Sequence, residues 1–174
     1  MINQQKLDDL ISDIEYLKYE IQSLSKVISF VPYSRKPLGG ESIIENLVSI
    51  NSAQSKIVTV LEALKKQGEE IQLNDFSIFE RVELSEEEIE NLTVSTVLKD
   101  IESLRTDLVN FLREKPSSYF EIEMTEESKP VSVLDILWAM VTEERKSLKE
   151  IAHLVLTYQS DKQFQREIAA RPKH

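Results

Sequence analysis

The sequence predicts an all-α protein, a four-helix bundle with long connections, and three observations lead to that prediction. Four long segments repeat apolar residues at an alternating spacing of three and four, which is typical of helices with one buried stripe. Only three of the 174 residues are glycine, and only 7% are aromatic. Prolines and loops interrupt the stripes, so they fall short of the sustained heptads of a coiled-coil filament.

The first two helices are predicted from their stripes and from one capping signal. The first stripe runs unbroken from Leu7 to Val31, which is about seven turns. The second helix is predicted from Ser42 to about Lys66. Ser42 and Glu45 have the spacing of a capping box, in which each side chain satisfies a free backbone N–H of the other residue. Between these helices, "VPYSRKPLGGE" has the proline and glycine content of a loop.

The third and fourth helices follow the same logic. The third stripe covers residues 94–111 and is stopped by Pro116. The fourth covers residues 134–158, and Ser132 with Asp135 forms a close relative of the capping box at its start.

The remaining segments are predicted as connections. Residues 68–92 are expected to form a crossover loop with one short helix, because three glutamates after Ser85 favour a helix start. Residues 118–125 alternate enough to form a short extended or hairpin segment. The tail from Gln159 is expected to form a short C-terminal helix with two apolar residues on one side, Phe164 and Ile168.

Composition narrows the class of protein further. The length suits a single domain over residues 1–174, and 41% hydrophobic residues can fill its core. There are no cysteines, which excludes thiol catalysis and thiolate metal sites. The net charge of −10 disfavours nucleic acid and anionic membrane as partners. The first residues show neither a signal peptide nor a membrane span, so a cytoplasmic location is expected.

The helix order and two local patterns resemble the DinB/YfiT-like superfamily of helical bundles. The patterns are the loop "FVPYSRKPLGG" ahead of "ESIIENLVSI" and the last helix "VLDILWAMVTEERKSLKEI", and the resemblance extends from about residue 5 to about 160. It implies a four-helix bundle and a homodimer formed through helix faces. Superfamily members include metal-dependent hydrolases and thiol-dependent transferases. Those that bind metal carry one histidine on the second helix and two on the fourth.

The resemblance places Ser49, Glu143 and Ser147 at these three ligand positions. Hydroxyl groups are poor ligands for zinc or nickel, so only the carboxylate of Glu143 is a competent donor. Shifting the alignment of the fourth helix with the superfamily pattern by one residue places Glu144 and Leu148 at its two ligand positions, which does not restore the site. We therefore expect no transition metal and no cofactor.

A polar pocket is the functional reading of these positions. The middle of the second helix, "VSINSAQSK", is rich in small polar residues, and the fourth stripe has its own polar step nearby in the predicted bundle. The competing reading is that Glu143 and Glu144 lie at the edge of the stripe and reach solvent or a basic side chain such as Arg145 or Lys149. The candidate pocket residues are Ser49, Asn51, Gln54, Glu143, Ser147 and Tyr33.

Other motifs have simpler explanations. Glu150 and His153 form an E-x-x-H pair, but a di-iron bundle needs a second such pair, and the only other histidine is His174. The pair Gly39-Gly40 has no strand before it, so a flexible loop explains it better than a phosphate site. Trp138 is expected in the core among its apolar neighbours.

Three functions remain open. The first is a small-molecule binding or accessory protein that lacks the superfamily's metal site. The second is a metal-independent transferase or hydrolase with Glu143 or Glu144 as its catalytic general base, the pKa raised by burial. The third is a structural homodimeric interaction module whose pocket is filled by side chains.

Overall fold

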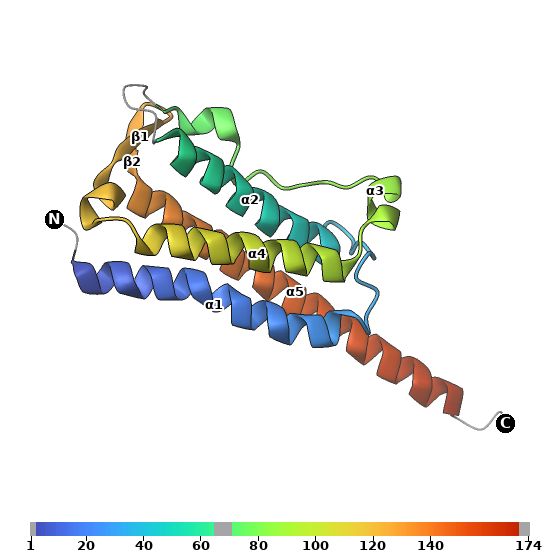
Figure 1. Ribbon diagram of the computed structural model, residues 1–174. Helices are drawn as coiled ribbons and strands as arrows, with labels where there is room; N and C mark the ends of the chain where they lie inside the picture. The colour runs from blue at the N-terminus through green and yellow to red at the C-terminus, as the bar shows by residue number, and fades with distance from the viewer. Residues whose placement is uncertain (1–2, 65–70, 171–174) are drawn as a thin grey trace.

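The computed structural model describes residues 3–64 and 71–170, and it is predominantly helical. Four long helices form the bundle (Figure 1), and shorter elements fill the connections between them. The long helices are α1 (Gln4–Ile28), α2 (Ile43–Ala63), α4 (Val94–Arg113) and α5 (Val133–Ala170). The short elements are the 3₁₀ helix Leu73–Phe76, α3 (Glu86–Asn91), the 3₁₀ helix Ser117–Glu121, and the strands β1 (Glu123–Glu126) and β2 (Lys129–Ser132).

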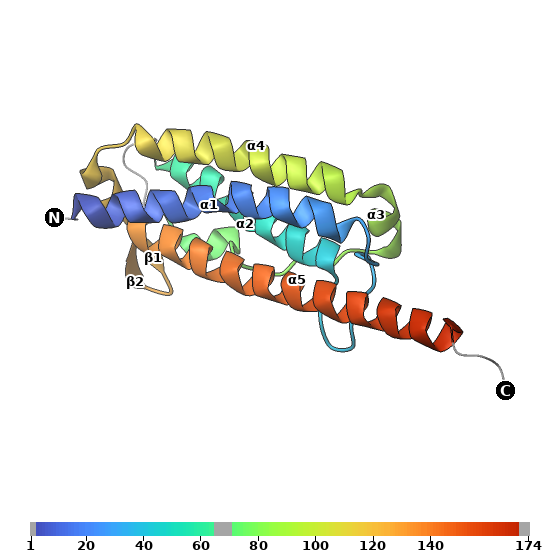
Figure 2. The ribbon, with the colours of Figure 1, turned by 90° about the horizontal axis from the view of Figure 1, so that it is seen from below.

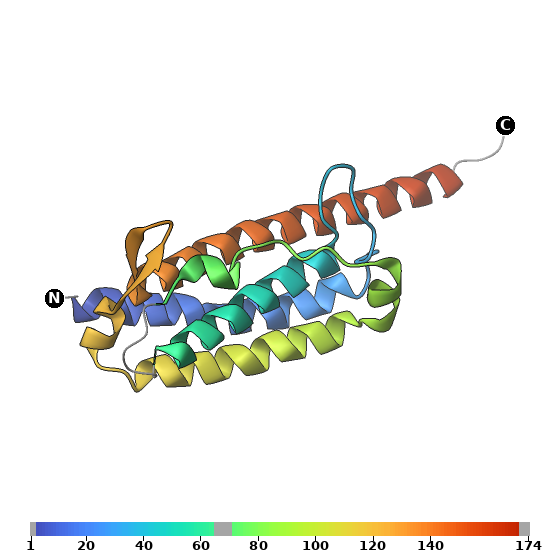
Figure 3. The same cartoon turned by 90° about the horizontal axis from the view of Figure 1, so that it is seen from above.

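The bundle has an unusual order of neighbours. Helix α1 packs against α4 and α5, and α2 packs against the same two helices, so consecutive helices α1 and α2 lie diagonally opposite each other. Helices α2 and α4 run in the same direction, against α1 and α5 (Figure 1). A parallel pair needs a long return connection. Residues 71–93 supply its described part by running back along the bundle between α2 and α5 (Figure 3). The predicted crossover is thus present, and it includes the predicted short helix α3.

Three predicted helix starts are confirmed by their hydrogen bonds. Ser42 and Glu45 form a complete capping box at the start of α2, and Ser85 and Glu88 form another at α3. At α5, the Asp135 carboxylate accepts from the backbone and the hydroxyl of Ser132. Each cap satisfies backbone N–H groups that a helix start would otherwise leave free.

Two predicted boundaries differ from the structure. The hairpin pairs β1 with β2 in antiparallel register, from Glu123 opposite Ser132 to Glu126 opposite Lys129, so it begins later than expected. The 3₁₀ helix after Pro116 takes up the first part of the predicted extended segment. The tail is not a separate short helix, because α5 continues unbroken to Ala170, with no proline or glycine to interrupt it. Its end projects beyond the other helices (Figure 2). The expected end of the second helix at Lys66 lies outside the described residues.

The apolar core consists of two clusters, one at each end of the bundle. One gathers around Leu10, Leu61 and the fully buried Phe120, and the other around Ile28 and Ile101. Polar side chains from α2, α4 and α5 lie between them and are described below. Trp138 was expected in the core but is 37% exposed, because α5 turns this face toward solvent. No helix in residues 3–64 or 71–170 is both long and apolar enough to cross a membrane.

Candidate functional site

The structure brings together the three positions that the resemblance singled out. Ser49 on α2 and Glu143 and Ser147 on α5 all border one small cavity between these helices. The cavity has a volume of only about 20 Å³, enough for a single water molecule. Phe79 and Arg81, from the crossover, border it as well.

The crossover residues 77–85, which we call the strap, bind both serines directly. The backbone N–H of Val82 donates a hydrogen bond to the Ser49 hydroxyl at 3.0 Å. Nη1 of Arg81 donates to the Ser147 hydroxyl at 2.9 Å. The two hydroxyls are therefore acceptors for the strap, and a guanidinium cation lies beside them.

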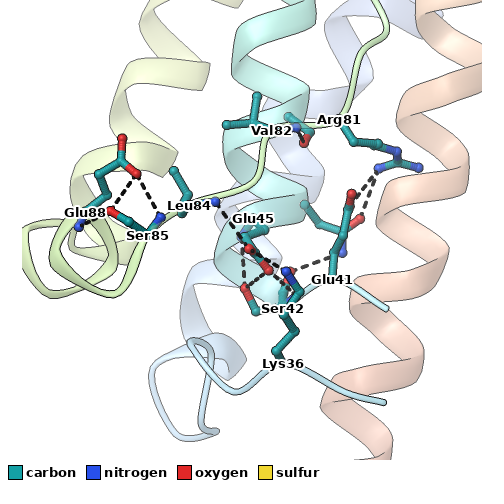
Figure 4. Close-up of polar contacts among 11 residues, drawn as sticks. Lys36, Glu41, Ser42, Glu45, Arg81, Val82, Leu84, Ser85 and Glu88 are labelled. Atoms are coloured by element: carbon teal, nitrogen blue, oxygen red, sulfur yellow. Dashed lines mark hydrogen bonds and ion pairs between the residues drawn. The ribbon is translucent and has the colours of Figure 1, made fainter. Parts of the chain in front are cut away.

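Arg81 is held by one edge of its guanidinium. Nη1 also reaches Glu41 at 3.3 Å and the amide oxygen of Asn46 at 3.4 Å, while the side chain stays 37% exposed. Figure 4 shows the Arg81 side chain extending from the strap toward Glu41. Burial raises the pKa of Glu41, Arg81 opposes that rise, and the nearby carboxylate of Glu150 adds to it.

The strap is fastened a second time through Glu45. This buried carboxylate accepts from the backbone N–H and hydroxyl of Ser42, each at 2.9 Å, from Leu84 N at 3.4 Å and from Lys36 Nζ at 3.2 Å (Figure 4). Burial alone would raise the pKa of Glu45, but these hydrogen bonds outweigh it and bring the pKa below its usual value. The same residue thus caps α2 and ties down the end of the strap.

The two glutamates in the polar step of the fourth stripe, Glu143 and Glu144, have different environments. Glu143 is partly exposed and pairs with Lys146 one turn along α5 at 2.5 Å. Glu144 is 6% exposed and pairs with Arg105 of α4, whose side chain is completely buried. Burial raises the pKa of Glu144, and the charge and hydrogen bonds of Arg105 oppose the rise.

Arg105 connects all four long helices at one level of the bundle. Besides Glu144, its guanidinium donates to the side-chain oxygen of Gln54 on α2 and, at 3.0 Å, to the backbone carbonyl of Ile14 on α1. Gln54 in turn donates to the carbonyl of Ile101 at 3.2 Å. The side chains of Arg105, Glu144 and Gln54, with these two carbonyls, form a buried polar centre between the two apolar clusters. Gln54 belongs to this centre and does not border the Ser49 cavity.

The other predicted pocket residues lie elsewhere. Asn51 does not border the Ser49 cavity, and its side-chain oxygen is buried without a partner in the described chain. Tyr33 does not border the Ser49 cavity either. Its backbone carbonyl accepts a hydrogen bond from Ile44 N at 3.0 Å, at the start of α2. Glu150 and His153 are exposed on α5. No group of three His, Cys, Asp or Glu side chains within residues 3–64 and 71–170 is placed to hold a metal ion.

A larger cavity lies beside the strap, and we call it the loop groove. It has a volume of about 500 Å³ and runs between residues 37–41 and the outer side of α5. Arg81 lies at its junction with the Ser49 cavity and borders both. The groove residues used below are Pro37, Glu41, Arg81, Glu150, His153 and Leu154.

Two side chains of the candidate site, Arg105 and Arg81, were not predicted from the sequence. Arg105 carries a usable signal, since it lies four residues after Ile101 and three before Leu108, within a buried stripe. A single arginine at such a position predicts a buried partner of opposite charge. Arg81 carries no comparable signal, because nothing in the spacing of the crossover predicts which of its residues will touch α2 and α5.

Comparison with known proteins defines the fold. No model of a known protein family matches the sequence, and no curated protein sequence is significantly similar to it. The structure belongs to the class of four-helix bundles with a YfiT-like arrangement. It is similar to YfiT from Bacillus subtilis, described as a probable metal-dependent hydrolase with an unusual four-helix bundle topology. The TM-score is 0.68, with 13% identity over 88% of each chain. The fold predicted from the resemblance is confirmed, and this level of identity speaks for the fold alone.

Proposed function

We propose that this protein binds a small molecule without a metal ion, in the loop groove beside the strap. One observation carries the proposal: Arg81 and Val82 already occupy the hydroxyls of Ser147 and Ser49. Only about 20 Å³ is left at the positions where the resemblance would place a metal site. The groove next to them is large enough for a ligand.

The chemistry of the donors supports a site that works without metal. Two hydroxyls and one carboxylate, the latter paired with Lys146, make a weak donor set for a transition metal. A divalent cation would also meet the fixed positive charge of Arg81, which lies 2.9 Å from one of those hydroxyls. The guanidinium supplies positive charge at this point of the fold, as a metal ion would.

The enzyme alternative has less support. Glu144 borders the Ser49 cavity, but it is buried and paired with Arg105, and a cavity of about 20 Å³ leaves no room for a substrate beside it. Glu143 lies at the cavity but faces Lys146. The structural-module alternative fits the filled Ser49 cavity but leaves the loop groove without a role. A homodimer and a cytoplasmic location stay predictions, and light scattering tests the first.

Metal content tests the proposal. Protein purified without chelator should carry far less than one zinc, nickel or iron ion per chain, as measured by mass spectrometry of the metal. A stoichiometric ion that survives dialysis would contradict the proposal.

A designed variant tests the physical reason. Replacing Ser49, Glu143 and Ser147 with histidine restores the donor set, and adding Arg81→Gly removes the competing cation. We expect the fourfold variant to bind one zinc ion and the triple variant with Arg81 intact to bind it more weakly. Equal zinc affinity in the two variants would show that Arg81 does not exclude metal.

A further inference from the structure

The loop groove has the size and composition of a ligand site. Its volume of about 500 Å³ lies within the usual range of roughly 300–1,000 Å³ for small-molecule pockets. Pro37 and Leu154 give it apolar walls, and its ionisable side chains come from three separate segments: Glu41 from the loop, Arg81 from the strap, and Glu150 with His153 from α5.

Arg81 borders this groove and has a hydrogen-bonding edge that no described residue occupies. All its contacts with Glu41, Asn46 and Ser147 are made through Nη1. Within the described chain, Nε and Nη2 have no hydrogen-bond partner, and the side chain is 37% exposed. Two parallel N–H groups on one edge of a guanidinium match the two oxygens of a carboxylate.

Negative charge exceeds positive charge among the side chains of the groove. Glu41 and Glu150 place two carboxylates against the single guanidinium of Arg81. The two carboxylates are close enough that Glu150 contributes to raising the pKa of Glu41. A positively charged group between them would relieve this repulsion.

We propose that the loop groove binds a small zwitterion that carries a carboxylate and an amino group, as free amino acids and short peptides do. The carboxylate lies on the Nε and Nη2 edge of Arg81, and the ammonium group lies near Glu41 and Glu150. A simple anion would meet two carboxylates, and a simple cation would meet the guanidinium, so a ligand with both charges fits best. This inference rests on the proposed function and names the class of its ligand.

Thermal-shift assays followed by calorimetry test the inference with defined probes. The probes are the twenty L-amino acids and glycylglycine, each alone, on the wild-type chain. At least one should raise the melting temperature. Its N-acetylated form and its carboxamide form should each bind about tenfold more weakly or worse, because each loses one of the two charges. The inference is overturned if no probe binds, or if the blocked forms bind as well as the free one.

Variants locate the site. Arg81→Gln and Glu150→Gln should each weaken binding of the same probe about tenfold or more, whereas Arg166→Gln, on the exposed end of α5, should leave it unchanged. Arg81→Lys retains the charge but not the paired N–H groups, so it should also bind the probe weakly. Circular dichroism verifies that each variant is folded. Unchanged binding in folded Arg81 and Glu150 variants overturns the inference. The proposed function fails separately, on a stoichiometric metal ion in the wild-type protein.

Discussion

Replacing Glu144 with glutamine tests the buried polar centre most severely. The substitution preserves the size of the side chain and one acceptor oxygen but removes its negative charge. Arg105, which is completely buried, would keep its positive charge with only neutral partners, the Gln54 side chain and the Ile14 carbonyl. Leaving one member of a buried ion pair uncompensated costs about 3–5 kcal/mol. That is a large part of the roughly 5–15 kcal/mol by which a typical domain is stable.

Thermal unfolding followed by circular dichroism measures this loss. At about 2–4 °C per kcal/mol for a domain of this size, the melting temperature should fall by roughly 6–20 °C. The neighbouring Glu143→Gln is the matched control, because it breaks only the partly exposed pair with Lys146 and should change the stability by less than about 1 kcal/mol.

The double variant Arg105→Met with Glu144→Leu separates the charge from the packing. Removing both charges avoids the uncompensated guanidinium, although Gln54 then loses its partner at a cost of about 1–3 kcal/mol. The double variant should therefore be more stable than Glu144→Gln. If Glu144→Gln is no less stable than Glu143→Gln, the ion pair does not hold the four helices as described.

Three further predictions concern other parts of the fold. The pKa of Glu45 is lowered in the folded state, so its ionised form stabilises the fold and this contribution is lost as the pH falls through that lowered pKa. Glu45→Gln should reduce the free energy of unfolding at pH 7, and its difference from the wild type should shrink below pH 4.5; a gap independent of pH would contradict this. Ending the chain after Ser160 should change denaturant stability by less than about 0.5 kcal/mol, because residues 161–170 are all exposed. Phe120→Ala should cost about 3–5 kcal/mol in the same titration, because the ring is fully buried; a loss below 1 kcal/mol would refute its place in the core.

The bundle could be predicted because its signals are local. Apolar stripes and capping pairs depend on residues that are close in the sequence. The pair of Ser42 and Glu45, for example, marks the start of α2 as predicted. The hairpin was misplaced because the residues after Pro116 form a 3₁₀ helix that buries Phe120, which the local alternation of residues does not reveal. The continuous α5 was missed because a polar stretch without glycine or proline does not reveal whether a helix ends or projects.

The candidate site was predicted only in part because it depends on contacts between distant segments. The sequence identified Ser49, Glu143 and Ser147, and the structure brings them to one cavity. Arg81 of the strap donates a hydrogen bond to Ser147 at this cavity. The two residues are 66 positions apart in the chain, and no local pattern connects them. The partner of Glu144 was likewise hidden on another helix, although the lone arginine in the α4 stripe could have revealed it.

Whether Arg81 takes the place of a metal ion can be seen in a crystal structure of the wild-type chain soaked with zinc, with anomalous scattering measured at the zinc edge. We expect the guanidinium of Arg81 on the Ser147 hydroxyl, the Val82 N–H on Ser49, and no anomalous peak between α2 and α5. A zinc ion bound by Ser49, Glu143 and Ser147, with Arg81 turned away, would contradict it.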